Sequence, residues 1–521
     1  MSLSAFARSL ALLALCVTPA SAIDWYVDGQ SGSDANSGTS PADAWKSITW
    51  ALANTPTGGV QRIHIAPAGY GHTTGEVFPL ALRPGVELIG MPGPLQPVIG
   101  WSPFYSISPT CRLETVAGSS LPAGAHIRLE NLGFTRGGRG VEVVHAGAGV
   151  LRVELESVRF DGVGLGMYFA AENDAAFDLD FERVEYESLS EHGLGGGVYV
   201  KSYASVRSTL SLRDSSFVGG YACAQFIGVL DVRAERSLLG GAIQECVLLG
   251  SSDAFPLTAD FESCAVVDSS NYGFRVSNQS CDARLTRCTI ADNGLAGVSV
   301  ASGSTTTQLT LDQCIVSNDT FDLVLPVNSV VRDSLIRSGQ YGGSNGNFAA
   351  DPLFADPASG DWSLRWGSPA IDRISDAGVA STLDLSGRTR GVDGDLDLLE
   401  RSDLGAFELR PLAAPLTARI GSQLRLSSWG PQGAASTIYW ARSAPVGPTA
   451  TPFGQFALPA GSLQVFSITT TGAAAPTLLQ RAIPNGAQLV GQTYSFQALV
   501  DSPAAPLGRA YTNVAPVTFE F

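Results

Sequence analysis

The sequence is poor in charged residues and almost lacks lysine. Charged residues make up 15% of the 521 residues, and the only lysines are Lys46 and Lys201. Low charge with 45% hydrophobic residues argues against a disordered chain, which needs high net charge and little apolar surface. Acidic residues outnumber basic ones by 48 to 32. The net charge of −16 excludes nucleic acid as an expected partner, because both surfaces would be negative.

Long apolar runs are missing beyond the N-terminus, and about 20 such residues are needed to span a bilayer. We therefore predict no membrane insertion. Residues 1–22 have the pattern of a secretory signal peptide, with Arg8 as the positive charge, Leu10 to Val17 as the apolar stretch and Ala20-Ser21-Ala22 as the cleavage site. The sequence predicts a secreted or cell-surface protein, cleaved near Ala22.

Cys-x-x-Cys pairs are also missing, which argues against a structural zinc site. Seven cysteines follow the signal peptide. They are Cys111, Cys223, Cys246, Cys264, Cys281, Cys288 and Cys314. Because seven is odd, at least one thiol is free or pairs between chains.

The strongest signal is a recurring six-residue phrase: apolar, polar, polar, small or apolar, any residue, apolar. Its nine copies start at Leu129, Leu155, Phe181, Leu212, Ala234, Phe261, Leu285, Leu311 and Val331, which are 20 to 31 residues apart. A second phrase follows most copies, as in Gly140-Val141-Glu142-Val143. A repeat this short cannot bury its own apolar face and must stack on its neighbours.

The repeated segments are short, rich in Val, Ile, Leu and Phe, and broken by Gly and Asn, which predicts strands. Leucine-rich repeats need an outer helix or a fixed Leu/Asn phrase, and a propeller blade needs about 40–50 residues. The sequence therefore predicts an all-β, right-handed parallel β-helix, a pectate-lyase-like solenoid. Its rungs would stack about 4.8 Å apart.

Two positions of the phrase carry further expectations. The fourth position should form one inward ladder, in which Cys264, Cys288 and Cys314 pack as buried thiols, although neighbouring rungs are also close enough for a disulfide. The second position is mostly acidic: Glu130, Glu156, Glu182, Glu235, Glu262 and Asp312. This row is either a cation-binding strip or a solvated bend offset by nearby arginines, and we favour the bend.

Residues 23–60 are expected to cap the β-helix, with a short helix from Ser47 to Ala53 covering open strand edges. The runs Trp25-Tyr26-Val27-Asp28, Trp45-Lys46-Ser47-Ile48 and Gly85-Val86-Glu87-Leu88-Ile89-Gly90 resemble the opening of secreted bacterial β-helix proteins. The part that includes Gly75-Glu76-Val77-Phe78-Pro79 is similar to an exported domain family with no assigned function. This resemblance implies the fold and export, and no activity.

Residues 61–409 are expected to form the β-helix together with a closing segment. Asp351-Pro352-Leu353-Phe354, Gly367-Ser368-Pro369-Ala370-Ile371-Asp372 and Asp403-Leu404-Gly405-Ala406-Phe407-Glu408 resemble the closing segment of bacterial surface β-helix proteins. The resemblance implies that this segment finishes the helix and precedes an attachment or accessory module.

Residues 411–521 contain few charges and several alternating runs split by Pro and Gly. Leu424 to Ser427, Thr437 to Ala441, Leu463 to Thr469 and Ser495 to Val500 are such runs. They predict a C-terminal antiparallel β-sandwich of about seven strands.

Catalytic motifs are hard to find in the rungs. The pectin-hydrolase phrases Asn-Thr-Asp, Asp-Asp, Gly-His-Gly and Arg-Ile-Lys are missing, and no convincing carboxylate pair for an inverting hydrolase stands out. Lyases of this fold use a Lys or Arg base with a calcium-binding carboxylate cluster, and Lys201 is the only lysine in the rungs. Glu142 and Lys201 are therefore weak catalytic candidates.

A binding surface is the alternative for the same strands. Alternation places Glu142, Tyr168, Tyr199, Lys201, Arg275 and Ser299 on the outer face of the second strand of each coil. Tyr168 and Tyr199 on adjacent rungs could form a stacking platform for a sugar chain, with Glu142 and Lys201 as polar contacts. Arg275 on the same face is a third candidate for binding carbohydrate. The alternative is that the two tyrosines pack under a loop.

Asp393, Asp395 and Asp397 have the every-second-residue oxygen spacing of calcium loops, and Asp403 follows them. Leu398 and Leu404 replace the Gly and Glu of an EF-hand, so the expected site would be a structural calcium of another kind. The alternative is a polar turn at the end of the β-helix.

The sequence thus favours a secreted or cell-surface β-helix protein that binds extracellular polysaccharide without a recognisable catalytic set. A polysaccharide lyase or glycoside hydrolase acting on an acidic polymer remains open, and so does a structural or adhesive scaffold. The fold alone does not choose among them.

Overall fold

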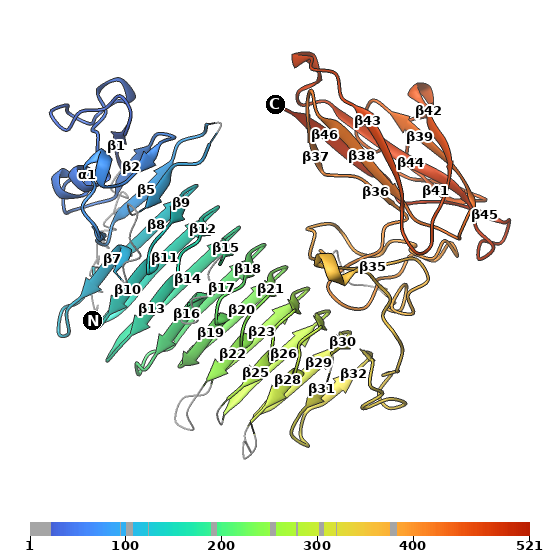
Figure 1. The fold of residues 1–521 in the computed structure, drawn as a ribbon, viewed down its shortest axis with the longest axis horizontal. Helices are drawn as coiled ribbons and strands as arrows, with labels where there is room; N and C mark the ends of the chain where they lie inside the picture. The colour runs from blue at the N-terminus through green and yellow to red at the C-terminus, as the bar shows by residue number, and fades with distance from the viewer. Residues whose placement is uncertain are drawn as a thin grey trace, which may run out of the picture.

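The computed structural model describes residues 22–93, 95–100, 108–122, 124–188, 195–250, 257–277, 280–301, 307–318, 320–375 and 383–521. The expected signal peptide lies outside this part except for Ala22. Within it, no helix has the length and hydrophobicity that crossing a membrane requires. Three parallel sheets wind around one apolar core, which confirms the predicted right-handed parallel β-helix (Figure 1).

Each complete coil contributes one strand to each sheet. The twelve-stranded sheet contains β1 (Ile23–Val27), β2 (Gln61–Ile65), β5 (Val86–Gly90), β8 (His126–Glu130), β11 (Gly149–Glu156), β14 (Ala175–Glu182), β17 (Ser208–Arg213), β20 (Leu230–Glu235), β23 (Leu257–Glu262), β26 (Cys281–Thr286), β29 (Gln308–Asp312) and β32 (Val330–Arg332). The eleven-stranded sheet contains β3 (Gly69–Tyr70), β6 (Val98–Gly100), β9 (Gly133–Thr135), β12 (Arg159–Asp161), β15 (Glu185–Glu187), β18 (Ser216–Val218), β21 (Leu238–Gly240), β24 (Ala265–Val267), β27 (Thr289–Ala291), β30 (Ile315–Ser317) and β33 (Leu335–Ile336). The ten-stranded sheet contains β4 (Leu80–Ala81), β7 (Pro109–Thr115), β10 (Arg139–His145), β13 (Leu165–Ala171), β16 (Gly196–Ser202), β19 (Ala222–Gly228), β22 (Glu245–Gly250), β25 (Tyr272–Val276), β28 (Ala296–Val300) and β31 (Phe321–Val324).

The six-residue phrase forms the bend between the twelve-stranded and eleven-stranded sheets. Its third residue is left-handed in all nine copies, with φ between 45° and 57°. These residues are Asn131, Ser157, Arg183, Asp214, Arg236, Ser263, Arg287, Gln313 and Asp333. None is β-branched, because a branched side chain is strongly disfavoured in the left-handed region. The same bend in every coil lets each rung lie directly on the one before it.

The fourth position of the phrase forms the inward ladder that the sequence predicts. Its residues are buried in every copy, from Leu132 to Ser334. Cys264, Cys288 and Cys314 are free, fully buried thiols that donate to backbone carbonyls, such as Cys288 Sγ to Phe261 O at 3.4 Å. The interpretation of these cysteines as packing residues is confirmed.

The acidic second position is neutralised by arginines, as the solvated-bend interpretation expects. Arg128 lies 2.9 Å from Glu130, 3.0 Å from Glu154 and 2.6 Å from Glu156. Further along, Arg287 lies 2.8 Å from Glu262. Guanidinium groups thus lie between like charges on successive rungs.

The N-terminal end is covered by α1 (Ile48–Asn54), which confirms the predicted capping helix. Ser47 caps it by accepting from Trp50 N at 3.1 Å. The buried Glu76 carboxylate accepts from Ile48 N and Thr49 N, both at 2.8 Å, and so ties the helix to the β-helix. The segment that contains this cap also supplies β1, which pairs with β2 at the edge of the twelve-stranded sheet.

The closing segment packs on the outer face of the last strands of the eleven-stranded sheet. It contains the antiparallel pair β34 (Phe354–Asp356) and β35 (Asp361–Leu364). Trp362 is buried against Ala265, Val267 and Ala291 of that sheet. Gly405 has φ of 80°, and a Cβ there would lie 2.6 Å from Thr289 Oγ1, so this contact requires glycine.

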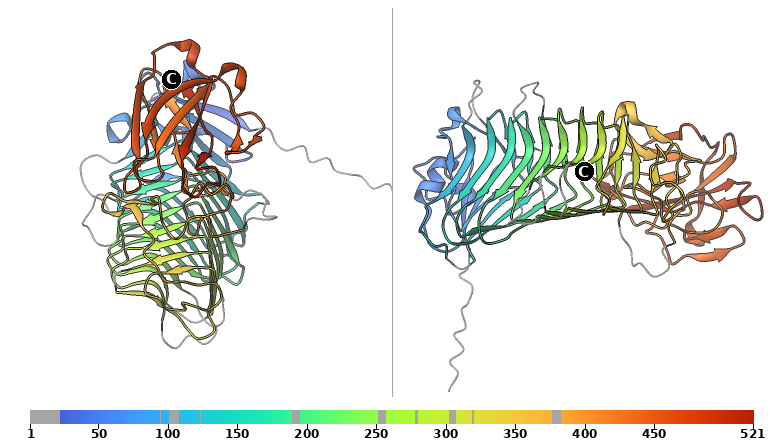
Figure 2. Two further views of the ribbon diagram at one scale, coloured as in Figure 1. Left: turned by 90° about the vertical axis from the view of Figure 1, so that its right-hand side faces the viewer. Right: turned by 90° about the horizontal axis from the view of Figure 1, so that it is seen from below.

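The C-terminal module is a β-sandwich, as predicted. A three-stranded sheet contains β36 (Leu412–Ala413), β38 (Gln423–Ser428) and β43 (Thr477–Ala482). A six-stranded sheet contains β37 (Thr417–Arg419), β39 (Ala435–Ala441), β42 (Gln464–Thr470), β44 (Thr493–Asp501), β45 (Arg509–Tyr511) and β46 (Ala515–Glu520), and β40 (Thr449–Thr451) pairs with β41 (Gly454–Phe456). The module contains more strands than the seven predicted. Strands of two or three residues are too short to show an alternation of apolar and polar residues in the sequence. Figure 2 shows the rungs stacked in a row, with this module beyond their last coil.

The remaining elements are short 3₁₀ helices at Pro41–Asp43, His72–Thr74, Pro357–Ser359, Ala460–Ser462 and Ala487–Leu489.

The buried cysteines give a direct test of this packing. In a protein made as residues 23–521, we expect no rapid reaction of any of the seven thiols with Ellman's reagent at pH 8. All seven are buried, and burial raises the pKa of Cys281 to about 12, so thiolate is scarce. Denaturant should expose all seven. A fast-reacting thiol in the folded protein would contradict the burial of the cysteines. Fewer than seven reactive thiols after unfolding would contradict their assignment as free.

Candidate functional site

The predicted outward row lies in the ten-stranded sheet. The strand register aligns Glu142 with Tyr168, and Tyr168 with Tyr199. Lys201 follows two residues after Tyr199 in β16. The prediction that the two tyrosines lie on adjacent rungs is confirmed. Tyr203 directly follows β16, is 61% exposed and was not predicted as part of the row.

The two tyrosine rings do not form a flat platform. Their centroids are 5.5 Å apart and their planes meet at 76°, an edge-to-face arrangement. Two cations lie over the Tyr168 ring, with Arg139 Cζ at 4.5 Å and Lys201 Nζ at 5.4 Å from its centroid. The two rings thus form a mixed surface of phenol groups and cations.

We call this surface the tyrosine–cation patch. It consists of Arg139, Tyr168, Tyr199, Lys201 and Tyr203. Lys201 Nζ lies 5.9 Å from the Tyr203 ring centroid, so one ammonium group contacts aromatic rings on two sides. The patch is cationic although the chain as a whole has a net charge of −16.

The protonation of Lys201 and the pairing of Glu142 bear on their candidacy as catalysts. A hydrogen bond with Tyr168 is the main cause of a raised pKa of Lys201, so the amine stays protonated at neutral pH. Glu142 is buried, its Oε1 lies 3.2 Å from Arg112 Nε, and its Oε2 accepts from Arg139. A general base works best with a pKa near the working pH. The raised pKa of Lys201 does not suit a general base, and the Glu142 carboxylate is engaged by two guanidinium groups.

Arg275 lies in the same ladder but apart from the patch. Gln225 and Leu248 occupy the two intervening rungs between Tyr199 and Arg275. The Arg275 guanidinium lies 2.7 Å from Glu245 and 4.6 Å from the centroid of the Tyr272 ring. Arg275 therefore already has two partners of its own.

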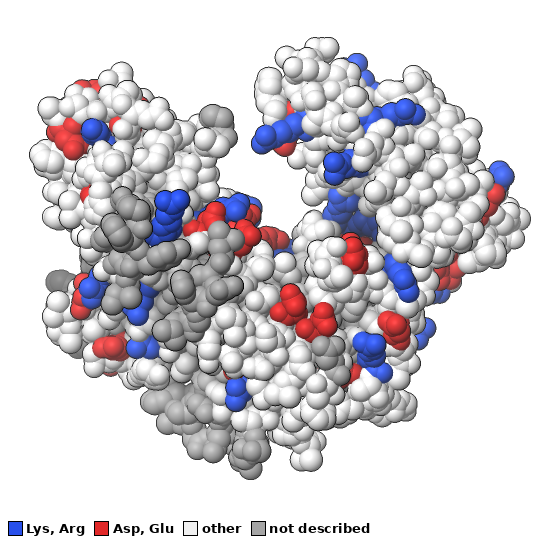
Figure 3. All heavy atoms as spheres, in the orientation of Figure 1, with Lys and Arg blue, Asp and Glu red and all other residues white. Residues whose placement is uncertain are grey.

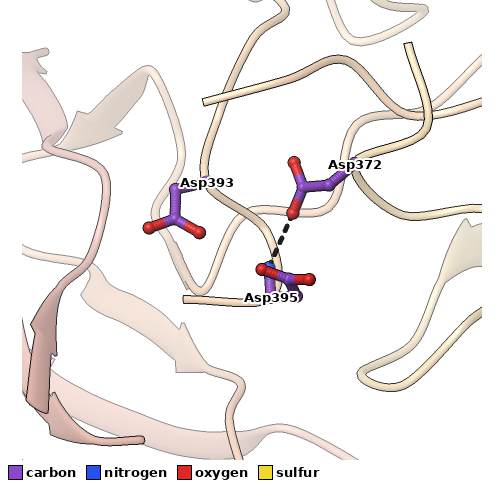
Figure 4. A group of neighbouring side chains, drawn as sticks. All are labelled: Asp372, Asp393 and Asp395. Atoms are coloured by element: carbon purple, nitrogen blue, oxygen red, sulfur yellow. Dashed lines mark hydrogen bonds between the residues drawn. The ribbon is translucent and has the colours of Figure 1, made fainter. Parts of the chain in front are cut away.

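The carboxylates expected to bind calcium divide into two groups. Asp393 and Asp395 come together with Asp372, a residue that the spacing argument missed, and one ligand atom of each lies within 4.8 Å of the others (Figure 4). Burial, followed by neighbouring carboxylates, raises the pKa of Asp372 to about 8 and that of Asp393 to about 7.

Asp397 and Asp403 have other partners. Asp397 lies 3.6 Å from Arg401 in an ion pair. Asp403 is fully buried and accepts from Asp372 N at 2.8 Å and from Leu409 N at 2.6 Å, so it fixes the backbone of the closing segment. The four-residue set suggested by the sequence is therefore not one cluster.

A groove of about 970 Å³ lies between the closing segment and the C-terminal module, lined in part by Arg388, Arg410, Arg425 and Trp429. The guanidinium groups of Arg388 and Arg410 donate to the carbonyls of Ala414 and Thr389. Two of the three arginines thus serve to join segments of the chain. In the surface view, basic side chains also gather on the side of the C-terminal module that faces the hollow between the two ends of the molecule (Figure 3).

Comparison with known proteins gives a family match for the N-terminal part. Residues 30–92 match the family described as protein of unknown function (DUF1565). This match agrees with the resemblance of the opening segment to a family without assigned function. No curated protein matches the chain.

Several solved structures are similar to this chain at low sequence identity. Pectate lyase Pel9A is 13% identical with a TM-score of 0.48, covering 74% of this chain and 96% of that one. The tailspike protein of an Acinetobacter phage is 9% identical with a TM-score of 0.32, covering 89% and 87%. A rhamnogalacturonan lyase is 10% identical with a TM-score of 0.29, covering 64% and 90%. Similarity at this level concerns the fold and carries no argument about substrate.

The pairing of Arg275 can be tested by stability measurements. We expect Arg275→Ala to lower the free energy of unfolding by about 1–2 kcal/mol, because the Glu245 carboxylate, 7% exposed, loses its charged partner. Urea titration followed by circular dichroism measures this. The double variant Arg275→Ala/Glu245→Gln should recover part of the loss. Equal losses in the single and double variants would show that the pair is not the cause.

Proposed function

We propose that this protein is secreted or held at the cell surface, where it binds an acidic polysaccharide at the tyrosine–cation patch without cleaving it. The observation that carries the proposal is the grouping of three tyrosines with Arg139 and Lys201 on neighbouring rungs. A protonated Lys201 suits a uronate carboxylate, and charge-assisted hydrogen bonds of this kind are among the stronger ones.

The shape of the surface also supports a polymer as the ligand. Strands of the ten-stranded sheet repeat at about 4.8 Å and present side chains in rows. A row of this kind suits a chain of repeating units better than a single small molecule. The aromatic rings supply apolar contact for sugar rings, and Tyr203 is the most exposed of the three.

The contacts of the two weak catalytic candidates, Lys201 and Glu142, support binding without cleavage. Lys201 is held as an ammonium group, and Glu142 is held between two guanidinium groups. Cleavage by a lyase or hydrolase and a purely structural role are the alternatives, and the assays below distinguish them.

The two lysines of the chain provide a matched pair of variants. We expect Lys201→Gln to weaken retention on polygalacturonate about tenfold, because one charge-assisted contact is lost. Lys46→Gln removes the same charge from an exposed site near α1 and should bind like the wild type. Affinity electrophoresis of the mature protein on uronate-containing and neutral polysaccharides measures both.

Three outcomes would contradict the proposal. Equal retention of Lys201→Gln and the wild type would remove the patch as the site. Loss in Arg425→Gln but not in Lys201→Gln would place binding in the groove instead. New reducing ends, or ultraviolet absorbance of unsaturated products, in the same samples would show an enzyme.

The aromatic part of the patch has its own test. The double variant Tyr168→Ala/Tyr199→Ala should bind at least tenfold more weakly, since it removes apolar contact and the partner of Lys201. Trp50→Ala, which removes a 42% exposed ring from α1, is the control and should bind normally. Unchanged retention of the double variant, with a normal melting temperature, would favour a scaffold without affinity for saccharide.

A further inference from the structure

Three carboxylates from two separate segments meet where the β-helix joins the C-terminal module. Asp372 follows Ile371, which packs with Leu364, Leu404 and Trp429 in the junction core. Asp393 and Asp395 belong to a loop about 20 residues further along the chain. One oxygen of each carboxylate lies within 4.8 Å of the others (Figure 4).

Asp372 provides independent evidence that a ligand belongs here. The residue is buried, with 5% of its surface exposed. Its Oδ2 accepts from Gly394 N and Asp395 N, both at 2.9 Å, whereas Oδ1 has no hydrogen-bond partner among the residues that the structure describes. A buried acceptor without a partner costs free energy, and a bound cation would remove that cost.

The three carboxylates form no direct ion pair in the described part of the chain, although Arg401 attracts Asp395 from a greater distance. In the described ranges, no arginine or lysine lies within ion-pair distance of Asp372, Asp393 or Asp395, whereas Asp397 pairs with Arg401 and Glu408 lies 3.6 Å from Arg390. The nearby cations are thus engaged with other carboxylates.

The ligand atoms and the loop favour calcium among common cations. All three side chains offer carboxylate oxygens, the ligands of hard cations. The loop is irregular, with Leu396 and Leu398 left-handed at φ of 59° and 76°. Calcium accepts irregular geometry with water or backbone carbonyls completing its shell, whereas magnesium demands a near-ideal octahedron.

The loop that holds Asp393 and Asp395 also inserts into the C-terminal module. Leu396 is fully buried in the core of the sandwich, and its carbonyl accepts from Ser502 Oγ at 3.3 Å. Gly394 permits the close approach, because a Cβ there would lie 2.8 Å from Ile371 Cγ2. A cation at this place would therefore connect both parts of the protein.

We propose that Asp372, Asp393 and Asp395 bind one calcium ion that fastens the C-terminal module to the end of the β-helix. The proposal does not depend on the saccharide patch, which lies on the ten-stranded sheet.

Calorimetric titration of CaCl₂ into the EDTA-treated mature protein tests the site. We expect one calcium per chain, and at least tenfold weaker binding in Asp372→Asn. Asp361→Asn, an exposed carboxylate of the closing segment, is the control and should bind like the wild type. Asp397→Asn should also retain binding, because Asp397 pairs with Arg401. Equal loss in Asp397→Asn and Asp372→Asn would overturn the ligand set.

Hydrogen–deuterium exchange of the wild-type protein tests the calcium site without any variant, and so applies even if a variant fails to fold. Calcium should slow exchange of residues 391–403, and MgCl₂ at the same concentration should not. No calcium uptake by the wild type, or exchange in this segment that calcium leaves unchanged, would overturn the proposal.

Discussion

The stacking of one backbone conformation on the next is the constraint on which the whole β-helix depends. Each coil must turn at the same place, and it does so through a left-handed residue at the third position of the phrase, at Asn131, Arg183 and seven further positions. A left-handed residue with a side chain costs about 1–2 kcal/mol, and the ladder hydrogen bonds and buried fourth position offset this cost. Because the register is fixed by this bend, the outer faces of the sheets become rows of side chains at constant spacing.

Those rows explain why charge is arranged as it is. On the twelve-stranded sheet, acidic residues outnumber arginines, and arginines such as Arg128 each pair with several carboxylates and so reduce the repulsion between rungs. On the ten-stranded sheet, the same geometry gathers tyrosines around Lys201, which leaves a local positive surface on an acidic protein. A similar difference separates Asp397, which pairs with Arg401, from Asp372, which has no such partner in the described part of the chain.

Most of the fold could be predicted, because the positions of strands, bends and core residues follow from the repeating pattern of apolar residues. The left-handed conformation of the bend could not be predicted, since Ser157, Arg183 and Gln313 are not residue types that favour it. The orientation of the Tyr168 ring depends on its contact with Arg139 and on packing. The spacing of residues in the sequence reveals neither. Tyr203 was missed because alternation ends with β16, and Asp372 was missed because only the closing segment's path brings it beside Asp393.

The central claim is that saccharide contacts the protein at Lys201, and the scarcity of lysine allows a direct measurement. The mature protein would be acetylated with and without oligogalacturonate, and mass spectrometry would give the labelling rates of Lys201 and Lys46 in the same molecule. The account predicts that the saccharide slows labelling of Lys201 and leaves Lys46 unchanged. Equal rates at Lys201 with and without saccharide, under conditions where binding is saturated, would contradict it.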